Sequence, residues 1–470
     1  MSEKKTPLLG SPTSLEGRLP LKQAIPLGMQ HVLAMFAGNL TPILIITAAC
    51  GIASGSPLQI EILQNAMLVA GLATLVQIYP IGPVGARLPI VMGTSSGFIG
   101  VCRSAAAAMG GGIVGYGAVM AANFVGGIFE GALGFCLKPL KKFFPPVVTG
   151  VVIFSIGMSL IGVGISSFGG GNGARDYGSM ENLLVGLIVL VSILIFKHKG
   201  RGVFSTASIL FGIIIGYIVC ALMGLILPTT AALDGAEYVK GWALQWDKVA
   251  AASWVSLPRL MPVKFVFDIR AILPICIMFI VTAVETIGDT SGITIGGLNR
   301  EATDKELSGS VVADGLTCTL ASVFGVLPVT SFSQNVGLVY MTKVVNLFAI
   351  SLGGVFLVLC GLLPKLAAIV SIMPPSVLGG AAVMMFASIA ISGIQLITKE
   401  PLTARTVTIV SVAIGLGYGL GANDGALRLM PDAVRLIFGG SGIVAACLVA
   451  IILNIVIPEN KNRAPEDAKR

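Results

Sequence analysis

Acidic side chains stand inside apolar stretches of the second half of the sequence. Glu285 and Asp289 lie four residues apart in FIVTAVETIGDTSGI, so a helix would carry both on one face. A carboxylate at bilayer depth costs about 2.5–3.5 kcal/mol even on the scale derived from membrane insertion. We therefore interpret Glu285 as a group that accepts ligand N–H donors or carries a proton, with a structural hydrogen bond as the alternative. For Asp289 and Asp314, coupling and scaffold roles fit equally well.

Two amide side chains, Gln334 and Asn335, stand next to each other in an uncharged run, SFSQNVGLVYMT. Each amide must find hydrogen-bond partners there or cost several kcal/mol. A primary amide has one acceptor and two donors, which complement the C=O and N–H groups of a lactam. A site of this kind rejects analogues that lack those groups. We interpret the pair as groups that recognise a hydrogen-bonding ligand.

Histidine is rare in this sequence, with only two copies. His31, in GMQHVLAMFAGN, either orients a carboxylate and senses protonation or packs as a satisfied helix histidine. Asn39 on the same predicted helix is interpreted as structural. His198 stands between two lysines and is interpreted as a solvated loop residue.

Composition defines the protein class. The 470 residues are 55% apolar and only 11% charged, whereas soluble proteins carry about 25% charged residues. This predicts a polytopic membrane protein in contact with the lipid bilayer. The net charge of +8 is then attributed to basic cytoplasmic loops rather than to nucleic-acid binding. The eight cysteines form no Cys-x-x-Cys pair, so neither a metal site nor a disulfide framework is expected.

Apolar segments of about 20 residues predict the membrane spans. We expect 14 spans and a cytoplasmic N-terminus, because basic residues then gather on the inner loops. The three shortest or interrupted candidates are 88–102, 309–324 and 328–350. The long segment 228–270 carries all three tryptophans and is expected outside or at the membrane interface.

The two halves of the sequence resemble each other. Segments 143–165 and 372–394 share Pro-Pro-x-Val-x-Gly, and LPIVMGTSSGFIG (88–100) parallels LPVTSFSQNVGLV (327–339). Seven spans per half is an odd number, so the second half enters the membrane from the opposite side. Inverted repeats are typical of secondary transporters. Chance similarity between apolar segments rich in Gly and Pro is the alternative.

Pro89 and Pro328 occupy matching places in the two short segments, and small polar residues follow each of them. Proline removes a backbone donor, and β-branched residues favour extended chain. We therefore expect a short extended piece leading into a half-helix in each segment, with both helix N-termini facing one central site. Simple kinks with satisfied hydroxyls are the alternative.

These motifs resemble the nucleobase–ascorbate transporter family. Its signature, Gln/Glu/Pro-Asn-x-Gly-x4-Thr-Arg/Lys/Gly, is similar to QNVGLVYMTK. QHVLAMFAG resembles the family's first span, ETIGD its eighth, and Ala-Asp-Gly at 313–315 its ninth. The resemblance covers roughly residues 20–457.

The resemblance implies an all-α polytopic membrane protein of 14 transmembrane segments in two inverted repeats of seven, with short extended strands in spans 3 and 10. It also implies a core domain moving against a gate domain, often in a homodimer. The implied parts are a cytoplasmic tail (1–22), core (23–137), gate (138–228), outer loop (229–270), core (271–373), gate (374–457) and a cytoplasmic tail (458–470).

The same resemblance implies a substrate site between spans 3 and 10. Glu285 would bind N–H groups of the base and Gln334 its amide-like edge. Relatives often place an aromatic residue where Ser96 stands; Phe98 would compensate, or the pocket would be roomier. The remaining substrate-binding residues would be Ser333, Phe332 and Gly38, and the coupling or supporting residues would be Asp289, Asp314, His31 and Asn335.

We expect a secondary transporter that imports xanthine or uric acid by proton symport with elevator-like alternating access, without cofactor, in a bacterial inner (plasma) membrane. Family members with Gln-Asn tend to take these purines, whereas uracil carriers tend to have Glu first. The sequence also allows sodium coupling, a uracil or other nucleobase permease, or a sulfate or bicarbonate carrier, although Glu285 disfavours an anion carrier. A channel does not need inverted broken helices, and the sequence has no HExxH motif or nucleophile–base pair typical of an enzyme.

Overall fold

The computed structural model describes residues 10–136, 145–171, 174–233, 236–399, 401–431, 434, 438 and 442–458. Nine helices of this part are long and apolar enough to cross a membrane, so the multi-pass class expected from composition is confirmed. They are α1 (Leu21–Ala49), α2 (Pro57–Ile78), α4 (Gly112–Phe135), α6 (Pro146–Phe168), α7 (Met180–Lys199), α9 (Ser208–Ile226), α11 (Ile269–Leu298), α16 (Pro375–Ile397) and α17 (Ala404–Ala422).

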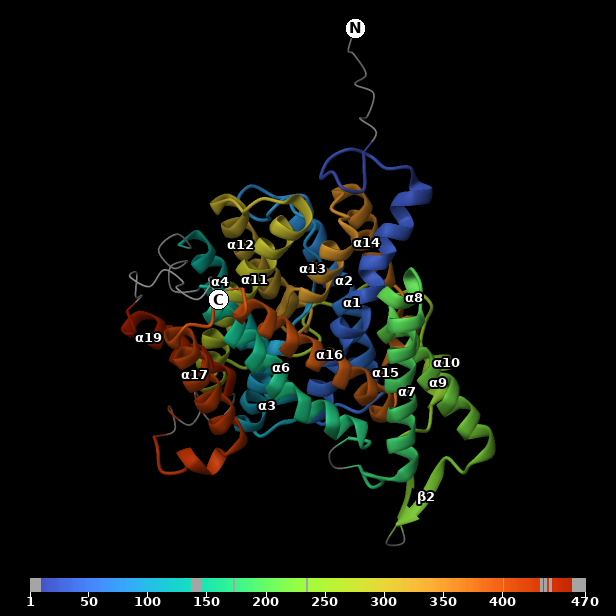
Figure 1. Ribbon diagram of the computed structural model, residues 1–470. Coiled ribbons are helices and arrows are strands. Elements are labelled where there is room, and N and C mark those ends of the chain that lie inside the picture. The colour runs from blue at the N-terminus through green and yellow to red at the C-terminus, as the bar shows by residue number, and fades with distance from the viewer. Residues whose placement is uncertain are drawn as a thin grey trace, which may run out of the picture.

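Shorter or less apolar helices complete the bundle (Figure 1). A tenth apolar span forms if two helices that meet at an angle of 83° are counted together, α14 (Leu347–Cys360) and α15 (Pro364–Ser371). The others are α3 (Ile99–Ala108), α8 (Val203–Thr206), α10 (Trp246–Ala251), α12 (Asp304–Val323), α13 (Ser333–Thr342) and α19 (Gly442–Val456). The start of the expected N-terminal tail, nearly all of the expected C-terminal tail and the expected boundary at 137/138 fall outside the described residues.

The two short segments are broken, as their prolines suggested. Strand β1 (Met92–Thr94) leads through a 3-10 turn (Ser96–Phe98) into α3, and strand β4 (Val329–Ser331) leads into α13. The strands pair antiparallel, with Gly93 opposite Thr330. The segment expected as one span over 328–350 differs: α13 ends at Thr342, and Lys343 takes a left-handed conformation before α14 begins.

Helix packing repeats between the two halves. α4 packs on α12 and α11, and α14 packs on α2 and α1, the corresponding helices of the other half. α7 packs on α9, as α17 packs on α19, while α6 and α16 run along each other. Small residues permit this last contact: a Cβ on Gly157 would lie 2.3 Å from the backbone nitrogen of Ala390.

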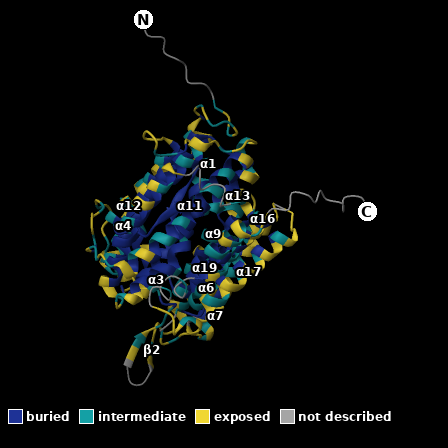
Figure 2. Cartoon of the chain, turned by 90° about the vertical axis from the view of Figure 1, so that its left-hand side faces the viewer, coloured by how far each residue is buried: buried dark blue, intermediate teal, exposed yellow. Residues whose placement is uncertain are grey.

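The helices divide by how deeply they are buried (Figure 2). In the most apolar 18 residues of each helix, 72% of the residues of α1 and 78% of those of α2 are buried. The corresponding share is 22% in both α9 and α17. The first set therefore forms the interior, and the second set presents apolar side chains to the surroundings. The segment after α9 forms a hairpin, β2 (Thr230–Leu233) and β3 (Ala236–Val239), which projects from the end of the molecule opposite the start of α1 (Figure 1). Trp242 of the same segment is fully buried.

Candidate functional site

Strands β1 and β4 form the centre of the site. Beyond the ladder, Ser95 N–H donates to the Pro328 carbonyl at 2.8 Å, and Phe332 N–H donates to the Val91 carbonyl at 3.0 Å. Non-helical backbone at membrane depth survives only where it is buried or lines a cavity. Here each extended segment satisfies the backbone groups of the other. The pairing thus holds the starts of α3 and α13 close to each other.

Asp289 on α11 anchors the second broken segment. Its carboxylate accepts hydrogen bonds from Ser331 Oγ at 2.7 Å and from Ser333 Oγ at 2.9 Å. These donors come from the end of β4 and the first residue of α13. Asp289 therefore fixes the point where the strand turns into the helix.

Asp314 on α12 binds the same segment from another side. Its Oδ2 accepts hydrogen bonds from Thr330 Oγ1 at 3.1 Å and from the Thr286 hydroxyl. Its Oδ1 is buried without a hydrogen-bond partner. Asp314 thus links α12, α11 and β4 through one carboxylate oxygen and leaves the other oxygen free.

Glu285 and Gln334 differ from these anchoring groups. Glu285 lies one turn before Asp289 on α11, is 9% exposed, and keeps Oε2 without a hydrogen-bond partner. Gln334, in the first turn of α13, is half-buried and makes no hydrogen bond to the described residues. A buried polar atom without a partner costs free energy unless something binds it. These two groups are available to a ligand.

Asn335 and His31 join α13 to α1. The Asn335 amide nitrogen lies 3.2 Å from His31 Nδ1 and donates to the His31 carbonyl at 3.0 Å. His31 Nε2 is buried without a partner. The two residues expected in support of the site are therefore in direct contact, although neither reaches a carboxylate through a hydrogen bond in the described residues.

The predicted aromatic and small residues lie in two places. Phe332 packs against α1 and β1: a Cβ on Gly38 would lie 2.7 Å from its ring, and a Cβ on Gly93 would also lie 2.7 Å away. Phe98 is fully buried, and its ring centroid lies 4.8 Å from that of Phe279. Ser96 is half-buried at the start of the 3-10 turn.

A crevice of about 590 Å³ opens beside the first broken segment. Gly100 and Arg103 of α3 line one side, and residues of α6, α17 and α19 line the other. Arg103 also borders a neighbouring crevice of about 230 Å³. None of the predicted substrate-binding residues lines either crevice, so the strand junction is closed off from both of them in this conformation.

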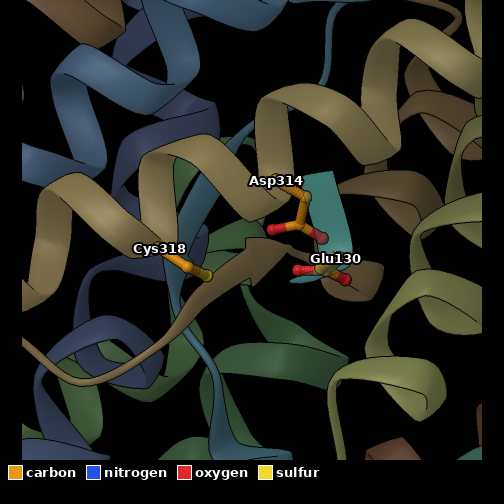
Figure 3. Close-up of side chains that lie close together, drawn as sticks. All are labelled: Glu130, Asp314 and Cys318. Atoms are coloured by element: carbon orange, nitrogen blue, oxygen red, sulfur yellow. The ribbon is translucent and has the colours of Figure 1, made fainter. Parts of the chain in front are cut away.

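Two polar residues of the site escaped the sequence-based prediction or were given less weight. Asn39, expected to be only structural, accepts hydrogen bonds from Thr94 N–H at 2.7 Å and Thr94 Oγ1 at 3.1 Å. Glu130 was not predicted at all. It is fully buried on α4, with Asp314 and Cys318 of α12 beside it (Figure 3). A single acid within the apolar segment 113–136 was the available signal.

The sequence of the chain is similar to those of known permeases. The model of a family described as "Permease family" matches residues 22–424. Xanthine permease XanP of Escherichia coli (strain K12) is 30% identical over 95% of this chain and 94% of its own. Uric acid permease PucK of Bacillus subtilis (strain 168) is 32% identical over 92% of this chain and 95% of its own.

Solved structures share the fold. The transmembrane domain of BicA, a cyanobacterium bicarbonate transporter, superimposes with a TM-score of 0.53, covering 93% of this chain and 98% of its own. The sequence identity is 14%, so this likeness concerns the fold alone.

Proposed function

The chain belongs to the nucleobase–ascorbate transporter family of permeases, and from this premise we propose that it imports a purine nucleobase, xanthine or uric acid, by proton symport. The observation that carries the proposal is the pair of polar groups left free at the strand junction, Glu285 Oε2 and the Gln334 amide. The names of the relatives XanP and PucK support the choice of purines.

The chemistry of the free groups suits an oxopurine. A carboxylate accepts N–H donors, so Glu285 would bind ring N–H groups of the base. The Gln334 amide would donate to a carbonyl and accept from the adjacent N–H, the pattern of a lactam edge. Phe332 would contact the face of the ring. Ser333 would then act through Asp289, to which it donates a hydrogen bond, and Gly38 would act by leaving room for the Phe332 ring.

Alternating access would use the division of the helices. We propose 14 spans, arranged as two repeats of seven spans that are inverted relative to each other. Helices α1–α4 and α11–α15 would form the core domain, and helices α6–α9 and α16–α19 would form the gate domain. The 590 Å³ crevice supports this division because α1 and α3 line one side and α6, α17 and α19 line the other. An elevator-like shift of the core would carry the strand junction past the gate. We further propose a homodimer in the bacterial inner membrane.

The test is uptake of radiolabelled xanthine, uric acid and uracil by cells that lack their own carriers. We expect uptake of at least one purine, with little uracil, and collapse of accumulation when a protonophore is added. Glu285→Ala should abolish uptake. Uptake of none of the three bases, or uptake that ignores the loss of Glu285, would count against the assignment.

Replacing sodium by choline in the same assay separates the two coupling ions. Proton symport predicts accumulation that persists in choline and disappears with the protonophore. Accumulation that requires sodium and persists when the protonophore is added would identify sodium, rather than the proton, as the coupling ion.

A further inference from the structure

A second acidic site lies behind the strand junction. Glu130 of α4 and Asp314 of α12 are both fully buried, and one carboxylate oxygen of each lies, together with Cys318 Sγ, within 4.8 Å of the others (Figure 3). No lysine or arginine is buried in the part of the chain that the structure describes. Two carboxylates this close in a low-dielectric interior cannot both be ionised without a cation.

Hydrogen bonds decide which carboxyl keeps the proton. Asp314 Oδ2 accepts from the hydroxyls of Thr286 and Thr330, and such donors stabilise a carboxylate anion. Both Glu130 oxygens lack a hydrogen-bond partner. The Thr282 hydroxyl is close to Glu130 but donates to the Phe279 carbonyl, at 3.1 Å. Asp314 therefore has two donors that stabilise its anion, whereas Glu130 has at most the weak influence of Thr282.

The unpartnered atoms complement each other once Glu130 is protonated. Asp314 Oδ1 is buried with no donor, and the neighbouring Glu130 carboxyl gains an O–H when it is protonated. One proton placed on Glu130 and directed at Asp314 Oδ1 gives a partner to that oxygen and to one of the two Glu130 oxygens. The side chains face each other across the contact between α4 and α12 (Figure 3).

We propose that Glu130 and Asp314 form a proton-binding site, with the proton on Glu130, and that this proton is the one coupled to substrate movement. The second part of the proposal rests on the proposed function. Loading the site forms the Glu130 O–H bond with a proton from water on one side of the membrane. Release breaks that bond and returns the proton to water on the other side.

The site is connected to the substrate groups by short steps. Thr330 bonds Asp314 and belongs to β4, whose next residue bonds Asp289. Thr286 bonds Asp314 and directly follows Glu285 on α11. A change in the charge of the pair therefore acts on both the strand and the helix that present ligand-binding groups.

The surroundings of Glu130 contain no other group that could take over this role in the described part of the chain. The titratable groups that act on it are Asp314 and Cys318 of α12 and Glu285 of α11. The third helix packed on α4 is α3, whose Cys102 is fully buried and whose Arg103 lines the crevices described above. Glu285 belongs to the substrate site, and Cys318 hydrogen bonds with the backbone of Val329.

The experiment uses the full-length protein in proteoliposomes and measures two reactions of xanthine. Exchange across the membrane at equilibrium needs no net proton movement, whereas accumulation driven by an inward proton gradient requires a proton to be released in each cycle. Glu130→Gln keeps the shape and an N–H donor towards Asp314 but cannot release a proton. We expect exchange within about threefold of wild type and at least a tenfold loss of gradient-driven accumulation. Glu301→Gln, the same change at an exposed residue after α11, is the control and should retain both reactions.

Two further measurements test the same proton-binding site by other means. Asp314→Asn tests the other member of the pair and should also lower gradient-driven accumulation at least tenfold. Infrared difference spectra of the purified protein should lose the carbonyl band of a protonated carboxyl in Glu130→Gln, whatever the substrate is. Normal accumulation by Glu130→Gln, or an unchanged band, would overturn the proposal, as would accumulation that follows a sodium gradient. Failure of wild type to exchange any purine, with the band lost in the variant, would instead overturn the proposed function alone.

Discussion

The two halves of the chain share a packing plan but hold their broken segments with different chemistry. In the first half the groups are neutral: Asn39 Oδ1 accepts from Thr94 N–H at 2.7 Å, and Thr74 Oγ1 accepts from Met92 N–H at 3.0 Å. All four residues are buried. Strand β1 therefore gains backbone partners without adding a charge to the interior.

In the second half the corresponding groups are acidic or sulfur-containing. Asp289 and Asp314 accept hydrogen bonds from Ser331 and Thr330, and Cys318 Sγ accepts from Val329 N–H at 3.2 Å. Cys318 thus does for the first residue of β4 what Thr74 does for the first residue of β1. Symmetric packing thus supplies the frame in both halves, while the carboxylates that hydrogen-bond a broken segment come from the second half alone in the described residues.

The largest effect is expected from removing the free carboxylate of the acidic half. Glu285→Gln keeps the size of the side chain but replaces one acceptor oxygen with a donor, which would face the N–H groups of the base. We expect purine uptake to fall at least 100-fold, while the amount of protein in the membrane stays unchanged. Kinetics of labelled xanthine uptake, with membrane protein quantified by immunoblot, check this. Retained uptake would show that the charged half does not bind the ligand.

A second variant introduces an acid into the neutral half. Asn39 uses only its oxygen, since its Nδ2 is buried without a partner. Asn39→Ala leaves the buried Thr94 N–H unpaired, at a cost of about 1–3 kcal/mol, whereas Asn39→Asp supplies the missing acceptor. We expect Asn39→Ala to show a clearly lower melting temperature than Asn39→Asp in detergent. Equal melting temperatures would mean that the neutral half does not depend on this bond.

Gln334→Glu should change the preference among bases. The substitution removes the two N–H donors of the amide and adds an acceptor, which favours a base edge richer in donors. We expect about a tenfold shift in the ratio of inhibition constants for xanthine and uracil, which corresponds to the net contribution of about one hydrogen bond. Competition against labelled xanthine measures the ratio, and Gln395→Glu, at the far end of α16, serves as the control. An unchanged ratio would place Gln334 away from the ligand.

Gly38→Ala probes the contact between α1 and the second broken segment. The new Cβ would lie 2.7 Å from the Phe332 ring, closer than real Cβ contacts come, so the ring must shift. We expect KM for xanthine to rise about two- to fivefold with little change in the maximal rate, corresponding to about 0.4–1 kcal/mol. Gly415→Ala, with open space around the new Cβ, is the matched control. A fall in the maximal rate alone would indicate that Phe332 affects movement rather than binding.

The smallest effect is expected outside the membrane, at the start of α11. Asp268 caps this helix, and its hydrogen bonds with the Arg270 side chain and backbone lower the carboxyl pKa to about 2. A lowered pKa means that its contribution to stability is present above the ordinary value near 3.8 and is lost as the pH falls through about 2. Asp268→Asn should therefore lower the melting temperature slightly at pH 7 and by a smaller amount at pH 2. An equal decrease at both pH values would exclude the ion pair as its cause.

Local sequence features predicted the broken segments well. Proline followed by β-branched and small polar residues located the start of each strand within three residues, because these features act on the backbone where they stand. The carboxylates of α11 and the amides of α13 also stood out, since polar groups in apolar runs need partners. What the sequence could not provide were those partners. The bonds of Asp289 and Asp314 to serines and threonines depend on helix packing over long distances along the chain.

Glu130 shows this limit most clearly. Its segment is apolar enough to be taken for a plain span, and nothing near it in sequence suggests a site. Its neighbour Asp314 becomes visible only once α4 packs on α12. Phe98 is similar: sequence places it beside the substrate, whereas its packing against Phe279 required the position of α11. The 83° bend between α14 and α15 likewise divides what the sequence presents as one apolar segment.

The pairing of β1 with β4 has a consequence for how the protein is made. Strand β1 is synthesised more than 200 residues before its partner, and the backbone groups that pair with β4 have no partner during that interval. These groups of the first half therefore need protection in the membrane, by chaperones or by the translocation machinery, until the second half has been synthesised. A gene fragment encoding either half alone should yield a polypeptide that cellular quality control degrades, and coexpression of both fragments should rescue it.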